Sequence, residues 1–312
     1  MKILYIHQYF RTPEEGGAIR SYYLAKGLVE NGIEVELITA HNEPVEVTKD
    51  IEGIKVHYLP VYYSNEQKFY ERIYAFFKFM RLARKKARKF SDVDLVYATS
   101  TPLTIGISAL KIKQDLNIPY YFEVRDLWPE APVQMGVIKN KLLKNYLKKL
   151  EKQVYENASK IVALSPGIKD QIAKQDPSKP ISVIPNMSDV DFFVPEEKDS
   201  ELEKTFDVKN KFVISYFGTI GLANHLEYLL AAANESLKAG APVQFFIIGM
   251  GAQLSRLKYL AKHFGLTNVK FLPFQNKYNL KRILNITDAA YVSFARKPIM
   301  ETNSPNKFFD AL

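Results

Sequence analysis

The sequence predicts an α/β fold made of two Rossmann-like domains, and three observations support this prediction. Short runs of β-branched and aromatic residues alternate with amphipathic stretches of helical period along the chain. Several runs are apolar throughout, as in strands that are buried on both faces of a parallel sheet. The alternation pauses after Pro185 and then begins again. We therefore expect the 312 residues to form two doubly wound domains.

The first domain is expected to span residues 1–195. Its first apolar run, ILYIH, precedes a loop that contains Gly16 and Gly17. The expected strands are 3–7, 35–39, 54–58, 95–99, 119–124, 160–164 and 181–185. The expected helices are about 18–30, 68–90, 102–116, 139–157 and 167–174.

A charged segment around residues 196–210 predicts an interdomain linker, and the second domain is expected over 211–312. Its expected strands are 212–218, 243–249, 269–273 and 289–294. Its expected helices lie near 224–238, 252–264 and 277–284, and a last one begins at Ser304. Because a doubly wound domain normally continues with a further strand and helix, we expect the second domain to be truncated.

Composition excludes several classes of site. The chain has no cysteine, which rules out disulfides and thiolate metal sites. The five histidines lack metal-ligand spacing, and the Asp-x-Asp strings at 92–94 and 189–191 suit turns better than a metal. We therefore expect no metal. No signal peptide or membrane-spanning stretch is evident, which favours a cytoplasmic location. The net charge of +9 favours anionic partners.

Three segments of the second half suit the phosphates of a nucleotide. The strings Gly218-Thr219-Ile220-Gly221 and Gly249-Met250-Gly251 each follow a strand, where glycine lets the backbone approach a ligand closely. In the segment 304–310, Ser304 as N-cap and proline at the first helical position predict a helix start that attracts phosphate. Turn glycines and an ordinary capped helix are the alternative, but three such sites together favour a nucleotide crevice.

In the first half, a charged segment leaves the strand at 119–124. It contains Arg125, Asp126 and the only tryptophan, Trp128. Ligands of open α/β sheets bind outside the carboxyl ends of the strands, so these side chains are candidates for a site. A surface turn with an Arg–Asp pair is the alternative.

The helix at 68–90 combines an apolar stripe with a basic face. The stripe is Phe69, Ile73, Phe76, Met80, Ala83, Ala87 and Phe90, and it suits a packed core. The basic face suits an anionic membrane surface, and both readings hold if Phe77, Phe79 and nearby residues are exposed. The predicted membrane-binding residues are Lys78, Arg81, Arg84, Lys85, Lys86, Arg88 and Lys89. A core helix with a basic solvent face is the alternative. No nucleic-acid-binding module is recognised, so we expect no nucleic acid partner.

These motifs together resemble a known family. The strings FEVRDLWPEAP, IVALSPGI, VIPNMSDVDFF, SYFGTIG, IIGMG and TNSPNKFFDAL are similar to signatures of bacterial retaining glycosyltransferases of family 4, which have the GT-B fold. The nearest branch resembles the O-antigen and capsule enzymes, including N-acetylfucosaminyl transferases.

The resemblance implies transfer from a nucleotide-diphosphate sugar, held mainly by the second domain, with no other cofactor. The acceptor would be a saccharide, often linked to a polyprenyl diphosphate, and the product a surface polysaccharide. The enzyme would work peripherally on the inner face of the cell membrane. Arg125 and Asp126 become candidate catalytic residues, and Asp310 matches the ribose-binding acid of the family's E-x7-E motif. Two alternatives are a truncated, non-catalytic nucleotide- or membrane-binding relative and another GT-B activity, such as that of a sugar epimerase.

The chain also departs from the family pattern. Thr302 stands where the motif has its first acid, with Glu301 one position away. Thr219 and Asn224 or His225 stand where many relatives have arginine and lysine, so we expect a different lysine to meet the diphosphate. The predicted donor-binding residues are Gly16, Gly17, Gly218, Thr219, Gly221, Gly249, Gly251, Lys297, Ser304, Asn306, Lys307 and Asp310.

Overall fold

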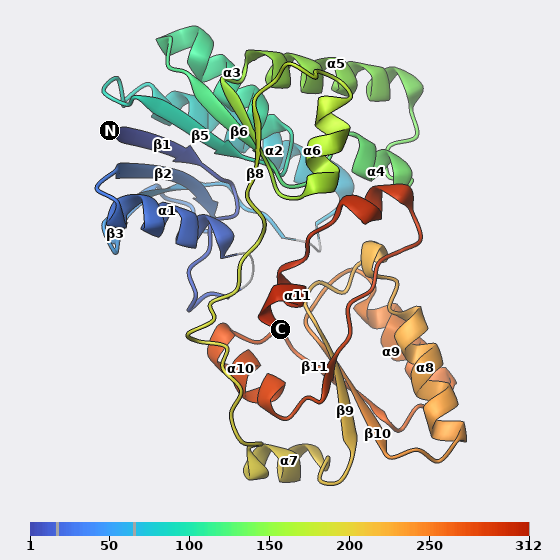
Figure 1. Ribbon diagram of the computed structural model, residues 1–312. Coiled ribbons are helices and arrows are strands. Elements are labelled where there is room, and N and C mark those ends of the chain that lie inside the picture. Colours follow the sequence, from blue (N-terminus) through green and yellow to red (C-terminus); the bar gives the residue numbers. More distant parts are fainter. Residues whose placement is uncertain (17–18, 65–66, 312) are drawn as a thin grey trace. The chain divides into compact units, whose positions relative to one another are not determined.

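The computed structural model describes residues 1–16, 19–64 and 67–311, which form two compact units (Figure 1). Unit 1 comprises Met1–Arg11, Ala18–Asn186 and Lys297–Ser304. Unit 2 comprises Thr12–Gly17, Met187–Arg296 and Pro305–Leu312. The main division therefore follows Asn186, earlier than the division predicted after residue 195.

Unit 1 is built on an eight-stranded sheet with the order β3-β4-β2-β1-β5-β6-β7-β8. All neighbouring pairs are parallel except β3–β4. The strands are β1 (Lys2–Ile6), β2 (Glu34–His41), β3 (Val47–Ile51), β4 (Ile54–Pro60), β5 (Leu95–Thr99), β6 (Tyr120–Val124), β7 (Lys160–Ala163) and β8 (Ile181–Val183). The sequence prediction missed β3 because this edge strand is polar and largely exposed, so it lacks an apolar run.

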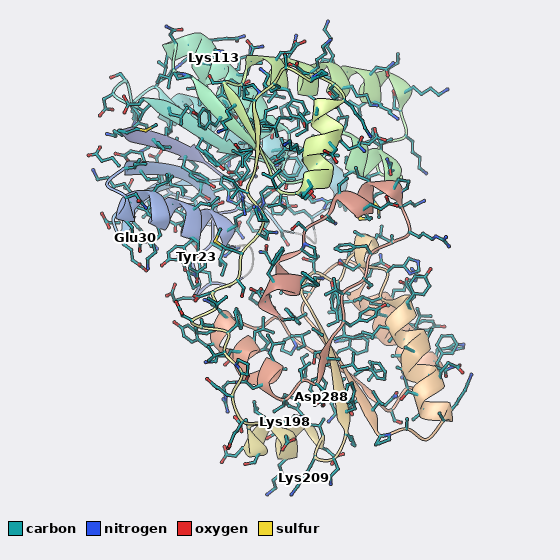
Figure 2. The ribbon with its side chains drawn as sticks, in the orientation of Figure 1. Tyr23, Glu30, Lys113, Lys198, Lys209 and Asp288 are labelled. Atoms are coloured by element: carbon teal, nitrogen blue, oxygen red, sulfur yellow. The ribbon has the colours of Figure 1, made fainter. Side chains whose placement is uncertain are left out.

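Helices cover both faces of this sheet, which confirms the doubly wound prediction. They are α1 (Arg20–Glu30), α2 (Phe69–Ala87), α3 (Thr104–Leu116), α4 (Glu130–Gln134), α5 (Lys141–Asn157), α6 (Pro166–Ala173) and the short 3-10 helix η2 (Pro298–Thr302). Tyr5, Leu37 and Val56 belong to the core beneath α1. The opposite face packs against α2, α3, α5 and α6. Lys113 of α3 donates to the Asn157 carbonyl at the end of α5 over 2.8 Å (Figure 2).

Unit 2 repeats this plan around a four-stranded parallel sheet with the order β11-β10-β9-β12. The strands are β9 (Phe212–Phe217), β10 (Val243–Ile248), β11 (Val269–Leu272) and β12 (Ala289–Ala290). The helices are α7 (Ser200–Phe206), η1 (Leu222–Asn224, 3-10), α8 (Glu227–Lys238), α9 (Leu254–His263), α10 (Lys277–Asn285) and α11 (Asn306–Asp310). One core lies beneath α8 and α9, and another beneath α7 and α10.

The segment predicted as a linker contains the helix α7. Asp199 caps this helix by accepting from the backbone of Leu202, and Leu202 packs on the core beside α10. Before the helix, Lys198 forms a 2.6 Å ion pair with Asp288, which precedes β12 (Figure 2). These tertiary contacts make part of the expected linker a fixed element of unit 2.

The Ser-Pro pair was expected to place Ser304 at the N-cap and Pro305 at the first helical position, and both lie one position too early. The helix α11 begins at Asn306, and Pro305 is its N-cap with no side-chain capping bond. The same pair at Ser165 and Pro166 does form that cap, because the Ser165 hydroxyl accepts from the Ile168 backbone over 3.1 Å. At Ser304 it is instead the carbonyl that is used, as an acceptor for the Asn186 amide.

A buried ion pair holds the carboxyl edge of the unit 1 sheet together. Arg20 at the start of α1 donates to Glu123 of β6 over 2.8 and 2.9 Å, and both side chains are at most 1% exposed. The same guanidinium donates to the carbonyls of Ile184 and Pro185 after β8. Thr99 of β5 donates to the other Glu123 oxygen over 2.9 Å.

We predict that Arg20→Met lowers the free energy of unfolding by about 3–5 kcal/mol, because it leaves Glu123 as an unpaired buried charge. The double variant Arg20→Met/Glu123→Leu removes that charge and should recover much of the loss. Arg84→Met, which removes a partly exposed ion pair with Asp115, is the control and should cost at most about 1 kcal/mol. Urea denaturation measures all three. Equal losses for Arg20→Met and Arg84→Met would contradict the prediction.

Candidate functional site

Two glycine loops lie side by side at the carboxyl ends of β9 and β10. The Ile220 amide donates to the Met250 carbonyl over 2.8 Å. A Cβ atom at Gly249 would lie 2.0 Å from the Gly218 carbonyl oxygen, and the φ angle of Gly249 is +138°. Packing of the two loops thus requires glycine at this position. The structure brings five predicted donor residues to one edge of the sheet: Gly218, Thr219, Gly221, Gly249 and Gly251.

Lys307 of α11 reaches the first of these loops. Its ammonium lies 4.1 Å from the centre of the Tyr216 ring and donates to the Tyr216 hydroxyl over 2.9 Å and to Asn224 Oδ1 over 3.3 Å. A Cβ at Gly218 would lie 3.4 Å from the same nitrogen. Within the described part of unit 2, no carboxylate forms an ion pair with it. Burial lowers the pKa of Lys307 to about 8. A part-buried cation therefore lies beside the glycine loop, and no carboxylate of the described part of unit 2 pairs with it.

Tyr216 and Asn224 also fix the backbone of this loop. The Thr219 carbonyl accepts from the Tyr216 hydroxyl over 2.5 Å and from the Asn224 amide over 2.8 Å. Tyr216 carries no motif in the sequence, because it is one of several aromatic residues in an apolar strand. Asn224 was noted only as a departure from the family pattern, whereas the structure shows that it contacts Lys307 directly.

Asp310, at the end of α11, lies among polar residues of unit 2. Burial raises the pKa of Asp310 to about 6, and nearby Asp189 also favours protonation, while a hydrogen bond from Ser188 and the charge of Lys277 act in the opposite direction. Lys277 forms a 2.5 Å ion pair with Asp189 and lies 4.1 Å from the centre of the Phe192 ring. Ser188 and Lys277 lie far from Asp310 along the chain, so no local motif pointed to them.

The other predicted donor residues divide between the units. Gly16 belongs to unit 2, where its φ angle is +69° and a Cβ would lie 3.0 Å from the Phe274 ring. Gly17 lies outside the described residues. Asn306 begins α11 in unit 2, whereas Lys297 and Ser304 belong to unit 1.

The E-x7-E position filled by Thr302 has a structural role in unit 1. The Thr302 carbonyl accepts from the Ser165 hydroxyl over 2.6 Å, and its own hydroxyl donates to the Ile299 carbonyl over 2.8 Å. A Cβ at Gly167 would lie 3.1 Å from the Thr302 Cα. The segment η2 therefore packs closely on the start of α6.

In unit 1, Arg125 and Asp126 follow β6 as predicted. The Arg125 backbone donates to the Ser100 hydroxyl over 3.0 Å, and its guanidinium lies 3.5 Å from His7 Nε2. Burial, together with the Arg125 charge, holds the pKa of His7 well below its usual value, so this imidazole is neutral. Desolvation raises the pKa of Asp126, and Arg125 opposes this shift. His7 was missed because a lone histidine after a strand carries no motif.

Acidic residues of both Asp-x-Asp strings contact lysine residues. Lys2 contacts both acids of the first string, through its backbone amide to Asp94 and its ammonium to Asp92. Asp189 of the second string pairs with Lys277. Within the described ranges, no three acidic or histidine side chains gather in a way that could hold a metal ion.

The helix α2 differs from its predicted stripe. The buried residues are Ala75, Phe79, Ala83 and Ala87, which recur every four residues and pack against the core that includes α3. The core and membrane readings of this helix were both to hold if Phe77 and Phe79 stayed exposed. Phe77 meets this condition at 52% exposure, whereas Phe79 does not, at 1%. The small alanines let the neighbouring helix approach closely.

The basic residues of α2 and the turn after it fall into two groups. Arg84 and Arg88 both pair with Asp115, and Lys86 pairs with Glu46 over 2.7 Å. These three charges are therefore partly neutralised. Among the described residues, no ion-pair partner occurs for the second group, which consists of Lys78, Arg81, Lys85 and Lys89. In the described part of the chain, no helix is both long enough and apolar enough to cross a membrane.

Comparisons with known families match both halves of the chain. The model described as Glycosyltransferase Family 4 matches residues 15–192, and that described as Glycosyl transferases group 1 matches residues 197–299. A curated protein of Escherichia coli (strain K12) that is named as a colanic acid biosynthesis glycosyl transferase, WcaI, is 35% identical over 83 residues. This match covers 27% of the chain and only 20% of the relative.

Solved structures share the fold at low sequence identity. Sucrose-phosphate synthase from Thermosynechococcus elongatus is 16% identical with a TM-score of 0.72, covering 95% of this chain and 77% of that one. HepE from Anabaena, solved in complex with UDP-glucose, is 19% identical with a TM-score of 0.68, covering 96% and 75%. These similarities show the two-domain glycosyltransferase fold that the sequence predicted.

We predict that Gly249→Ala destabilises unit 2 by about 2 kcal/mol or more, because the φ angle of +138° is nearly restricted to glycine and the new methyl group meets the Gly218 carbonyl. Gly240→Ala is the matched control. Its φ angle is also positive, at +63°, but nothing lies within 4 Å of the added atom, so a cost of about 1 kcal/mol is expected. Chemical denaturation compares the two, and similar losses would show that the loops can separate.

Proposed function

The chain belongs to glycosyltransferase family 4, and we propose that it transfers a sugar from a nucleotide-diphosphate donor to a saccharide acceptor with retention of configuration. The observation that carries this proposal is the Lys307 cation beside the glycine loop of Gly218. A buried charge normally has a partner, and a diphosphate would supply one. HepE, which shares this fold, was solved with UDP-glucose, and this supports a nucleotide sugar as the donor.

Lys307 is proposed to pair with the diphosphate in place of the basic residues that many relatives carry in this loop. Asn224 or His225 stands where many relatives have a lysine, and Asn224 Oδ1 accepts from the Lys307 ammonium. Lys307 of the helix α11 thus brings a positive charge to this part of the loop. The backbone amides of Thr219 and Gly221 would add hydrogen bonds to the phosphate oxygens, because those of Gly218 and Ile220 already donate to the carbonyls of Ile248 and Met250.

Asp310 is proposed to bind the ribose of the donor nucleotide. Its pKa of about 6 leaves a carboxylate at neutral pH, and a carboxylate can accept from two ribose hydroxyls. Gly16, Lys297, Ser304 and Asn306 remain proposed donor contacts.

The proposed reaction breaks the bond between the anomeric carbon and the diphosphate oxygen on the face from which the acceptor oxygen attacks. The acceptor proton passes to a phosphate oxygen, so the nucleotide diphosphate leaves with that proton. Negative charge develops on the leaving group, and a fixed cation such as Lys307 lowers the barrier by stabilising it. Arg125 and Asp126 are the proposed catalytic residues of unit 1, where the acceptor is proposed to bind.

We further propose a lipid-linked acceptor, such as a saccharide on polyprenyl diphosphate, for a surface polysaccharide, and contact of α2 with the inner face of the membrane. The similarity to WcaI, named for colanic acid biosynthesis, supports a polysaccharide product. Tyr70, Tyr74 and Phe77 are 64%, 69% and 52% exposed on α2, and Arg81 and Lys85 lie on the same helix. Exposed aromatic rings beside lysine and arginine are typical of helices that lie on anionic membranes.

We predict that Lys307→Met weakens binding of UDP about tenfold or more, since a hydrogen bond to a charged group contributes about 1.5–3 kcal/mol. In the unmutated chain, affinity should fall as the pH rises through about 8, where Lys307 loses its proton. The variant should lose this pH dependence. Lys238→Met, on the exposed face of α8, is the control. Calorimetric titration at several pH values checks both points, and an unchanged affinity for Lys307→Met would remove this residue from the donor site.

We predict that Arg81→Gln/Lys85→Gln reduces co-sedimentation with vesicles containing phosphatidylglycerol roughly tenfold or more, because each basic residue near the surface contributes about 1 kcal/mol. The control Lys258→Gln/Lys262→Gln removes the same net charge from α9 and should bind as before. Vesicles of neutral lipid should retain neither protein. Equal loss in the two variants would indicate that net charge, and not α2, directs binding.

A further inference from the structure

Unit 1 contains a pocket at the carboxyl edge of its sheet. Its volume is about 220 Å³, and its walls come from the segments that follow β1, β4, β5 and β6 together with α2. β1, β5 and β6 are neighbours in the sheet, and the strand order reverses beside β1. Ligands of open α/β sheets bind at this edge. The described lining residues are Tyr9, Tyr63, Arg72, Ile73, Phe76, Thr101, Pro102, Trp128, Pro132 and Val137.

The walls combine aromatic rings with one cation. Tyr63 lies between Tyr9 and Phe76, with ring centres 4.8 and 5.9 Å apart, and Trp128 adds a fourth aromatic side chain. Aromatic walls of this kind suit the apolar face of a sugar ring. Among the described lining residues, Arg72 is the single charged side chain and no acid is present.

Among the described residues, no hydrogen-bond partner occurs for two buried polar atoms of this pocket, Arg72 Nε and the Tyr9 hydroxyl oxygen. Buried polar groups are nearly always paired in native proteins, because leaving them unpaired is costly. Burial raises the pKa of the Tyr9 hydroxyl, so it remains a donor. Two hydrogen-bond donors with no acidic side chain beside them favour a ligand that carries an anionic group. The planar guanidinium matches the geometry of phosphate oxygens.

We propose that this pocket binds a glycosyl phosphate, with the sugar against the aromatic rings and the phosphate on Arg72 and Tyr9, and that this is the phosphate-proximal part of the lipid-linked acceptor. The inference rests on the proposed function. The volume is below the roughly 300–1,000 Å³ of drug-sized sites, so it suits one sugar and its phosphate and leaves a lipid outside. Tyr74 and Phe77, exposed on the same helix as Arg72, would meet that lipid.

Trp128, the only tryptophan of the chain, lines this pocket and reports its occupancy by fluorescence. The probes are glucose 1-phosphate, glucose, and glucose linked to farnesyl diphosphate. We expect a saturable change of emission with the phosphorylated probes and none with glucose. Arg72→Ala should raise the Kd at least tenfold, which corresponds to about 1.4 kcal/mol. Lys111→Ala, an exposed cation on α3, should leave the Kd unchanged.

A second pair of variants keeps the test independent of the folding of Arg72→Ala. Val137 is 47% exposed and lines the pocket, so Val137→Asp should repel the phosphate, whereas the matched Val137→Asn should not. Tighter binding of the farnesyl probe than of glucose 1-phosphate identifies the lipid-linked source, and equal binding identifies free glycosyl phosphate and overturns the acceptor assignment. An unresponsive Trp128, or wild-type affinity in both Arg72→Ala and Val137→Asp, overturns the pocket itself.

The pocket and the donor site can be tested independently of each other. Lys307→Met should leave the Trp128 titration unchanged, and Arg72→Ala should leave UDP binding unchanged. If UDP binds but the pocket variants have no effect, the further inference fails and the proposed donor function stands. If the pocket binds glycosyl phosphate but UDP does not bind, the proposed transfer fails and the pocket remains.

Discussion

The buried pair of Arg20 and Glu123 is the interaction on which the functional edge of unit 1 depends. It joins the first helix to β6, and through further hydrogen bonds to β5 and to the backbone after β8. A buried ion pair is favourable only when its geometry and remaining hydrogen bonds are well satisfied, and here the guanidinium also serves two carbonyls. The segments that carry Arg125 and Trp128 leave the sheet directly beyond Glu123. Their positions therefore rest on this pair.

Unit 2 presents the opposite situation, because no carboxylate of the described residues pairs with the Lys307 cation. Lys307 keeps hydrogen bonds to Tyr216 and Asn224, yet burial still depresses its pKa to about 8. The charged form of such a lysine is less favourable in the free protein than in a complex with an anion. Binding of an anionic ligand would therefore offset part of the free energy lost on burying the charge. The close packing of the two glycine loops fixes the backbone beside it, which limits rearrangement when a phosphate binds.

The helix α2 serves three purposes on three sides. Alanines and Phe79 pack into the core, Arg72 and Phe76 line the aromatic pocket, and Tyr74 and Phe77 remain exposed. Its basic residues are similarly divided, because Asp115 and Glu46 pair with some of them, and the others form no ion pair within the described residues. Counting charges along the helix therefore overstates the surface that is available to anionic lipid.

The sequence by itself determined the α/β class, the two doubly wound domains, nearly all of the strands and the loops that carry Gly218 and Gly249, because these depend on local periodicity and on glycine after a strand. It missed β3, α4 and α7, of which β3 and α7 are largely polar and are held by tertiary contacts. It also placed the start of α11 one position too early. Only the tertiary structure decided that Lys307 lies on Tyr216 and Asn224, and that Tyr9, Arg72 and Trp128 share one pocket. These contacts join residues far apart in the chain, and no local pattern records which distant side chains meet.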